Sequence, residues 1–291
     1  MKGIVLAGGL GTRLKPLTKV TNKHLLPVYD KPMIYYPIET LVRAGIEDIM
    51  IVTGGNCAGE FLRLLGNGHE FGLKHINYTY QQGEGGIADA LALCEHFAAG
   101  ERVVVILGDN LLEDDITPYV QRFEKQASGA RVLLKEVPDP HRFGVPEIRG
   151  ERIVRIDEKP LHPRSSYAVT GVYMYDHRAF GFCRGLQPSK RGELEITDVN
   201  NAYIAAGDLC YDMLSGWWTD AGEVESLFHA AQLVAQQRRS AVTPEAYRGA
   251  TDSTEGLRRS LSESNGEPPI DGQSIPKVGS SQATATAEDA S

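Results

Sequence analysis

The chain has 291 residues, 42% of them hydrophobic, which is enough for one large core or two modest ones. Its formal net charge of −8 disfavours nucleic acid or an anionic membrane surface as a partner. No apolar run reaches the length of a membrane span, no secretion signal opens the chain, and the cysteines show no Cys-x-x-Cys spacing, so we expect a cytoplasmic protein with reduced thiols.

Strands and helices alternate from the start of the chain to about residue 136. Hydrophobic patterning predicts strands at 4–7, 48–53, 76–80, 102–107 and 131–137, and helices at 33–44, 58–65, 87–97 and 116–126. Such alternation is typical of an α/β fold with a Rossmann-like, mainly parallel sheet flanked by helices. Ligands of these sheets bind beyond the carboxyl ends of the strands.

The pattern changes after residue 136. It predicts a hairpin of 144–148 and 152–156, strands at 167–175 and 209–214, and helices at 194–206 and 225–238. We expect these elements to extend the sheet as an inserted, β-rich subdomain. One domain is therefore expected over 1–238, with parts at about 1–136 and 137–238.

The end of the chain, 239–291, is rich in Ser, Thr, Gly, Ala, Glu and Pro. It cannot bury enough apolar surface to offset its ordering entropy, so we expect a disordered polar tail. A dispensable extension and a tether for a partner both remain open for it.

The first predicted strand runs into a glycine-rich turn that ends in a cation, Leu6-Ala7-Gly8-Gly9-Leu10-Gly11-Thr12-Arg13-Leu14. Successive backbone N–H groups in such a turn form a nest that binds anions, and an arginine can hydrogen-bond two phosphate oxygens at once. The turn lacks the Lys-Ser/Thr pair of a Walker A loop and the third glycine of a dinucleotide fingerprint. It therefore predicts a polyphosphate-binding loop, with a plain strand-to-helix turn as the alternative.

Two aspartates are candidate ligands of Mg²⁺. Asp109 directly follows the buried strand 102–107, and Asp220 lies between large aromatic residues and small ones in Trp217-Trp218-Thr219-Asp220-Ala221-Gly222. Mg²⁺ prefers one or two carboxylates together with waters and phosphate oxygens. A turn former or helix cap is the alternative for each aspartate, but the two could meet across one cleft.

Three further cations could serve a phosphate site with Arg13. Lys23 lies just beyond the glycine loop, Lys159 follows a strand, and Arg191 precedes a predicted helix. Each alone is compatible with a solvated surface charge. Together they supply the positive charge that phosphoryl-type transfer requires.

Seven segments make the chain resemble the sugar-nucleotide pyrophosphorylases, most closely the glucose-1-phosphate thymidylyltransferases. They follow the family's order from residue 1 to about 237: the glycine loop, Lys23–Pro37, Leu107–Asn110, Arg142–Val145, Glu158–Pro160, Tyr167–Gly171 and Arg191–Asn200. The resemblance implies the nucleotidyltransferase fold and Mg²⁺ as cofactor. It implies that glucose 1-phosphate attacks the α-phosphorus of dTTP, giving dTDP-glucose for polysaccharide or deoxysugar synthesis, and that pyrophosphate leaves.

The resemblance also implies roles for individual residues. Gly8, Gly11, Thr12 and Arg13 are implied to contact the triphosphate, and Arg13 and Lys23 to neutralise the leaving pyrophosphate. Gln81 and Gly86 are implied to contact the thymine, and Asp109 and Asp220 to bind the metal. Sugar contacts are implied for Asn110, Gly144, Glu158 and Val169, and sugar-phosphate contacts for Lys159 and Arg191. His24 stands where these enzymes usually have a glutamine near the nucleotide.

Some positions depart from the family pattern. His24, the turn after Gln81, and Thr219 and Ala221 beside Asp220 bear on base selectivity. UTP or another sugar 1-phosphate is therefore an alternative, and so is a non-catalytic sugar-nucleotide sensor. Whether the chain forms a homo-oligomer is left open by the sequence. Family members form a tetramer and a regulatory nucleotide site through a helical C-terminal portion, and the polar tail stands in its place here.

Overall fold

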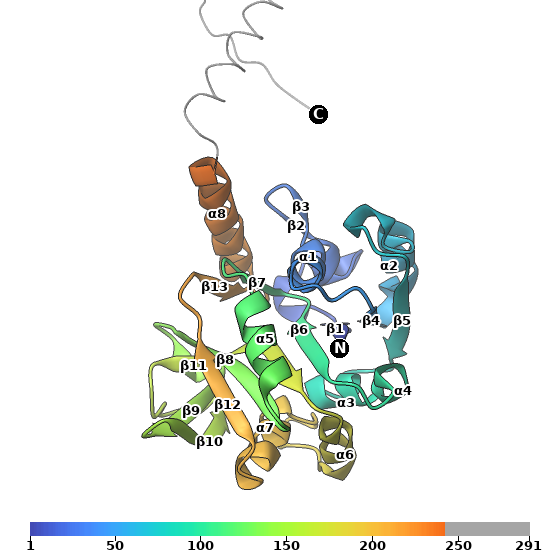
Figure 1. Ribbon diagram of the computed structural model, residues 1–291. Coiled ribbons are helices and arrows are strands. Elements are labelled where there is room, and N and C mark those ends of the chain that lie inside the picture. The colour runs from blue at the N-terminus through green and yellow to red at the C-terminus, as the bar shows by residue number, and fades with distance from the viewer. Residues whose placement is uncertain (242–291) are drawn as a thin grey trace, which may run out of the picture. The chain divides into compact units, whose positions relative to one another are not determined.

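The structure, a computed structural model, describes residues 1–241; the expected tail from residue 242 onward lies outside the described residues. Nine strands of the described part form one sheet in the order β10-β9-β11-β6-β1-β4-β5, with β8 beside β11 and β12 beside β8 (Figure 1). The strands are β1 (Lys2–Ala7), β4 (Ile49–Gly54), β5 (Ile76–Gln81), β6 (Val103–Leu107), β8 (Ala130–Glu136), β9 (Gly144–Arg149), β10 (Arg152–Glu158), β11 (Tyr167–Tyr175) and β12 (Leu209–Met213).

The first half of the sheet is parallel, as predicted, since β1 pairs with β4 and β6, and β4 pairs with β5. The inner strands β1, β4 and β6 are mostly apolar because helices cover both faces, whereas the edge strand β5 is more polar. One face carries α1 (Tyr35–Arg43), α2 (Ala58–Leu65) and α5 (Thr117–Lys125). The other carries α3 (Ile87–Ala92), α6 (Arg178–Gly185) and α7 (Ile196–Ala205). The predicted α/β fold is confirmed.

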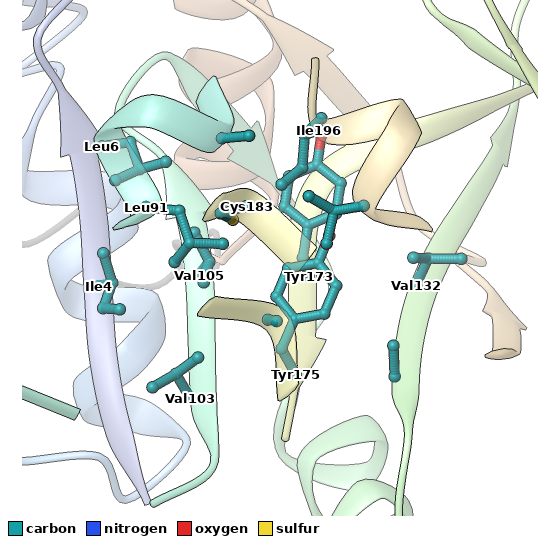
Figure 2. Packing of buried hydrophobic residues seen from close by; sticks show 14 of the residues in the cluster. Ile4, Leu6, Leu91, Val103, Val105, Val132, Tyr173, Tyr175, Cys183 and Ile196 are labelled. Carbon is teal, nitrogen blue, oxygen red and sulfur yellow. The ribbon is translucent and has the colours of Figure 1, made fainter. Parts of the chain in front are cut away.

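Successive residues of β1 belong to different cores. Ile4 and Leu6 pack into the cluster under α3, α6 and α7, whereas Val5 and Ala7 pack into the cluster under α1, α2 and α5. This follows from the two-residue period of a strand. Figure 2 shows the first cluster, where Tyr173 and Tyr175 of β11 lie one above the other; their rings stack with centroids 5.9 Å apart.

The second half of the sheet is mostly antiparallel and is organised by β11. This strand pairs antiparallel with β6, β8 and β9, and its register with β8 shifts between Val169 and Tyr173. At Val169 it pairs with Leu134 of β8 on one side and with Gly144 of β9 on the other. Thr170 and Gly171 lie inside this shift, so they do not take part in regular pairing with β8.

Several short elements were not predicted. The strands β7 (Asn110–Leu112) and β13 (Trp218–Asp220) form a separate antiparallel ribbon, and β2 (Pro27–Val28) pairs with β3 (Lys31–Pro32). The predicted helix 87–97 is divided into α3 and α4 (Glu95–Ala98), and α6 was missed. Strands of two or three residues are too short to show hydrophobic periodicity.

The last described element is α8 (Val224–Ala241). Its Ala230 and Val234 pack on Val28, Met33 and Leu111 in a third, smaller cluster. No helix within residues 1–241 is long and apolar enough to cross a membrane.

Candidate active site

A cavity of about 550 Å³ lies at the carboxyl ends of β1, β5 and β6, and every site residue named from the sequence lines it. Some lining residues had no predicted role: Arg142, Tyr173, Glu195, Trp218 and Gly222. The motifs far apart in the chain therefore converge on one space, as the carboxyl-end rule for open sheets predicts.

The glycine loop depends on close backbone approach. Gly11 has φ 64°, in the left-handed region that favours glycine, and a Cβ there would lie 2.8 Å from the Cβ of Lys23. A Cβ on Gly54 of β4 would lie 2.6 Å from the carbonyl oxygen of Gly8. The loop is therefore pressed against β4 on one side and against Lys23 on the other.

Lys23 forms an ion pair with Asp109 inside the cavity. Its Nζ lies 2.5 Å from Asp109 Oδ2, and both side chains are only 13% exposed. The lysine lies in a short 3₁₀ helix, Lys23–Leu25, which Asn22 caps by accepting a hydrogen bond from the backbone N–H of His24. The cap fixes the direction from which the ammonium group reaches the end of β6.

The ribbon of β7 and β13 brings the two predicted metal ligands together. Asp220 pairs in register with Asn110, and the backbone N–H of Ala221 donates to the carbonyl of Asp109 at 2.8 Å. Arg142 donates to both carboxylate oxygens of Asp220, each at 3.3 Å. Each aspartate therefore has its own cation, Lys23 for Asp109 and Arg142 for Asp220.

Gly222 marks the point where these groups converge. A Cβ at this position would lie 3.2 Å from Asp220 Oδ2, 3.4 Å from Asp109 Oδ2 and 3.4 Å from Arg13 Nη2. The missing side chain thus leaves room beside two carboxylate oxygens. No group of three or more His, Cys, Asp or Glu among residues 1–241 could hold a metal ion, so a cation here would need other oxygens. Two carboxylates completed by phosphate oxygens and waters fit Mg²⁺.

The two carboxyl groups are displaced in opposite directions. Burial opposes ionisation of Asp109, but the charge of Lys23 and hydrogen bonds from Lys23 and Asn110 outweigh it and hold the pKa below its usual range. Burial, and then the negative charge of Asp109, raise the pKa of Asp220 above its usual range, against the opposing charges of Arg142 and Arg13. A divalent cation between them would relieve their mutual repulsion.

His24 and Gln81 both line the cavity and are fixed by hydrogen bonds. His24 is 2% exposed, and its Nδ1 is 2.8 Å from Asn22 Oδ1. Burial, and then the charge of Lys23, lower the pKa of His24 to about 3, so the imidazole is neutral at pH 7. Gln81 donates from Nε2 to the Gly86 carbonyl at 3.0 Å and to Asp89 at 2.7 Å. Both side chains are held in place by the protein itself.

The other end of the cavity is formed by the antiparallel half. Lys159 has φ 45°, a strained conformation for a side-chain-bearing residue, and its Nζ is 3.6 Å from Glu158. Glu158 accepts a hydrogen bond from Thr197 at 2.6 Å. Arg191 pairs with Glu195 at 2.8 Å, Glu193 at 3.1 Å and Glu158 at 3.6 Å. Arg191 is therefore already neutralised by three carboxylates.

Sequence reasoning missed Arg142 and Trp218, although signals for both were present. Arg142 opens one of the segments that carry the family resemblance, and Trp218 lies two residues before Asp220. What it could not show is that Arg142 reaches Asp220 across 78 residues, or that the indole of Trp218 bonds to Asn110 across 108.

Comparison with known proteins agrees with this geometry. A sequence model of the family described as nucleotidyl transferase matches residues 2–237. A glucose-1-phosphate thymidylyltransferase of Neisseria meningitidis serogroup A is 47% identical over 238 residues, which cover 80% of this chain and 82% of that protein. One from Mycobacterium tuberculosis is 42% identical over 243 residues, 82% of this chain and 84% of its own length.

Solved structures lead to the same family. A Bacillus anthracis protein assigned as a glucose-1-phosphate thymidylyltransferase, solved in complex with a sucrose, is 55% identical, with a TM-score of 0.77 over 80% of this chain and 94% of its own. A UDP-glucose pyrophosphorylase complexed with UDP-glucose is 25% identical, with a TM-score of 0.71 over 81% and 98%. The chain belongs to the nucleotidyl transferase family, and within it groups with the glucose-1-phosphate thymidylyltransferases.

Proposed function

We propose that the chain is an enzyme that transfers a thymidylyl group from dTTP to α-D-glucose 1-phosphate, giving dTDP-glucose and pyrophosphate. A phosphate oxygen of the sugar phosphate forms a bond to the α-phosphorus of dTTP. The bond from the α-phosphorus to the bridging oxygen breaks, and its electron pair leaves with pyrophosphate. The observation that carries the proposal is the convergence of Asp109, Asp220 and Arg13 around Gly222.

At the nucleotide end, the glycine loop supplies backbone N–H groups, and Arg13 and Lys23 supply charge. We assign Gly8, Gly11, Thr12 and Arg13 to the triphosphate, and Gln81, Gly86 and His24 to the neighbourhood of the base. The cavity contains all of them. Their work is to align the α-phosphorus and to neutralise charge on the departing pyrophosphate, which is the main requirement of phosphoryl-type transfer.

Asp109 and Asp220 are the residues that would hold Mg²⁺. The ion would supply neutralising charge between the two anionic substrates, which otherwise repel each other. Lys23 lies at Asp109 and Arg142 at Asp220, so both cations are within reach of phosphate oxygens that approach the same carboxylates.

At the sugar end, Asn110, Gly144, Glu158 and Val169 are assigned to the glucose ring, and Lys159 and Arg191 to its phosphate. The strained backbone of Lys159 supports a functional role, because such strain is concentrated at ligand sites. No general base is needed, since the attacking phosphate is already an anion. The neutral His24 is consistent with that chemistry.

UTP is the second candidate nucleotide. It is favoured by the fold shared with a UDP-glucose pyrophosphorylase and by His24 at the position where thymidylyltransferases usually have glutamine. A pocket built on hydrogen bonds can discriminate strongly between bases. We propose dTTP because the relatives of 41–47% identity bear the thymidylyltransferase name.

The test is pyrophosphate release by the full chain with glucose 1-phosphate, Mg²⁺ and each nucleoside triphosphate in turn. The highest kcat/KM is expected with dTTP. A higher value with UTP would reassign the nucleotide, and binding of dTDP-glucose without pyrophosphate release from any triphosphate would instead support the sensor.

A further inference from the structure

We infer that Trp218 and Gly171 position the metal-binding carboxylate of Asp109 by holding the side-chain amide of Asn110 in one orientation. The inference rests on the proposed function, because it concerns residues that serve the same reaction. We call Trp218, Gly171 and Asn110 the amide clamp.

The donors around Asn110 fix the orientation of its amide. Its Oδ1 accepts from the backbone N–H of Gly171 at 2.9 Å and from the indole Nε1–H of Trp218 at 2.7 Å. Backbone and indole N–H groups can only donate, so the amide oxygen must face them. The Nδ2 group is thereby turned toward Asp109 and donates to its Oδ1 at 3.0 Å.

The clamp is tightly enclosed. A Cβ on Gly171 would lie 2.6 Å from the amide carbon and oxygen of Asn110, so only glycine leaves space for this side chain. Asn110 is 2% exposed and Trp218 8% exposed, and the indole packs edge-on against Phe143 at 5.1 Å. Strands β7, β11 and β13 each supply one member, at the place where β11 leaves regular pairing with β8.

The amide clamp gives the two carboxylate oxygens of Asp109 different partners. Oδ1 is occupied by Asn110, whereas Oδ2 faces Lys23 and lies 3.4 Å from the Cβ position at Gly222, close to Asp220 Oδ2. Asn110 therefore keeps Oδ2 directed at the space between the carboxylates. Hydrogen bonds of this kind behind a metal ligand contribute about 10–100-fold to metal affinity.

The test compares two adjacent tryptophans. Trp218→Phe keeps an aromatic ring beside Phe143 and removes the N–H donor. Trp217→Phe is the matched control, because Trp217 packs with the α8 cluster and donates to Glu113 through its backbone N–H. The dissociation constant of Mn²⁺ is measured on the full-length protein without nucleotide, by water-proton relaxation.

We expect Trp218→Phe to raise the Mn²⁺ dissociation constant about tenfold, at the lower end of such effects, and Trp217→Phe to leave it unchanged. The Mg²⁺ concentration for half-maximal turnover should rise in parallel, and saturating Mg²⁺ should restore both kcat and KM for the nucleotide. Equal Mn²⁺ affinity in the two variants would overturn the inference.

A second variant covers the case in which Trp218→Phe fails to fold. Gly171→Ala displaces the Asn110 amide from the opposite side and should weaken Mn²⁺ binding similarly; unchanged binding would count against the clamp. Mn²⁺ affinity is measured without nucleotide, so a preference for UTP would refute the proposed substrate and leave this result standing.

Discussion

The two ends of the cavity hold their cations in different ways. Lys23 is 13% exposed and lies 2.5 Å from a single carboxylate, whereas Lys159 is 42% exposed and 3.6 Å from its nearest one. At the end where we propose that Mg²⁺ binds, called the metal end below, Lys23 and Asp109 are largely buried and already paired with each other. At the end that we propose for the sugar phosphate, Lys159 is more exposed and more loosely paired. A buried lysine such as Lys23 should therefore matter for stability as well as for the proposed activity, whereas an exposed one such as Lys159 should matter mainly for the proposed activity, because unpaired charge is costly only where water is excluded.

The largest effect should follow Asp109→Asn, which removes a charge from the metal end. We expect kcat to fall about 10³-fold, the upper range for loss of one preorganised electrostatic group. Pyrophosphate release at saturating substrates measures it. Asp212→Asn is the matched control, since Asp212 is similarly buried and paired with Arg131 at 2.6 Å outside the cavity. Near-normal turnover of Asp109→Asn would rule out its role in metal binding.

Replacing each lysine by methionine sharpens the contrast between the two ends. Lys23→Met leaves the buried charge of Asp109 unpaired, so we expect a loss of about 3–5 kcal/mol in the free energy of unfolding at pH 7, with low turnover. Lys159→Met should change stability by less than about 0.5 kcal/mol and act on KM for glucose 1-phosphate. Urea unfolding measures the two stability changes, and steady-state kinetics measure kcat and KM. Equal losses of stability in the two variants would contradict the difference between the two ends of the cavity.

The opposite pKa displacements at the metal end predict its response to acid. The pKa of Asp109 is lowered in the folded state, so its contribution to stability is present above the unfolded value and is lost as pH falls through the folded one. The pKa of Asp220 is raised, so Asp220 takes up its proton first and Mg²⁺ affinity should decline at a pH above 3.8. Mg²⁺ titrations from pH 7 to pH 4 should show weakening before the fold melts.

The smallest effect is expected far from both ends. A chain that stops after Gln237 loses the ion pair of Arg238 with Asp30, 3.1 Å apart and 55% and 40% exposed. Exposed pairs contribute about 0–1 kcal/mol, so thermal stability and turnover should be nearly unchanged. An insoluble product would show that the part beyond Gln237 is structural.

The sequence predicted the elements that bury a periodic face and the residues that bear charge. The parallel strands around β1 and the helix Ala58–Leu65 were found in this way. It could not predict the ribbon of β7 and β13, because three-residue strands have no measurable period. That ribbon brings Asp109 and Asp220 together, so the sequence predicted the two candidate metal ligands but not the element that unites them.

Pairing was equally invisible in the sequence. Arg191 was predicted as a cation for the sugar phosphate, and the structure surrounds it with three glutamates, so that role stays a prediction. Arg142 was passed over although it bonds to Asp220. Charge can be counted from a sequence, but its partners depend on which loops meet.

In the cavity without ligands, the charges of Lys23 and Asp109 neutralise each other. A triphosphate that binds Lys23 by itself would leave the carboxylate of Asp109 unpaired. A divalent cation that binds Asp109 by itself would leave the ammonium group of Lys23 unpaired. When triphosphate and cation bind together, both Lys23 and Asp109 keep a partner of opposite charge. Binding of nucleotide and cation should therefore be cooperative, and each should raise the affinity for the other by the same factor.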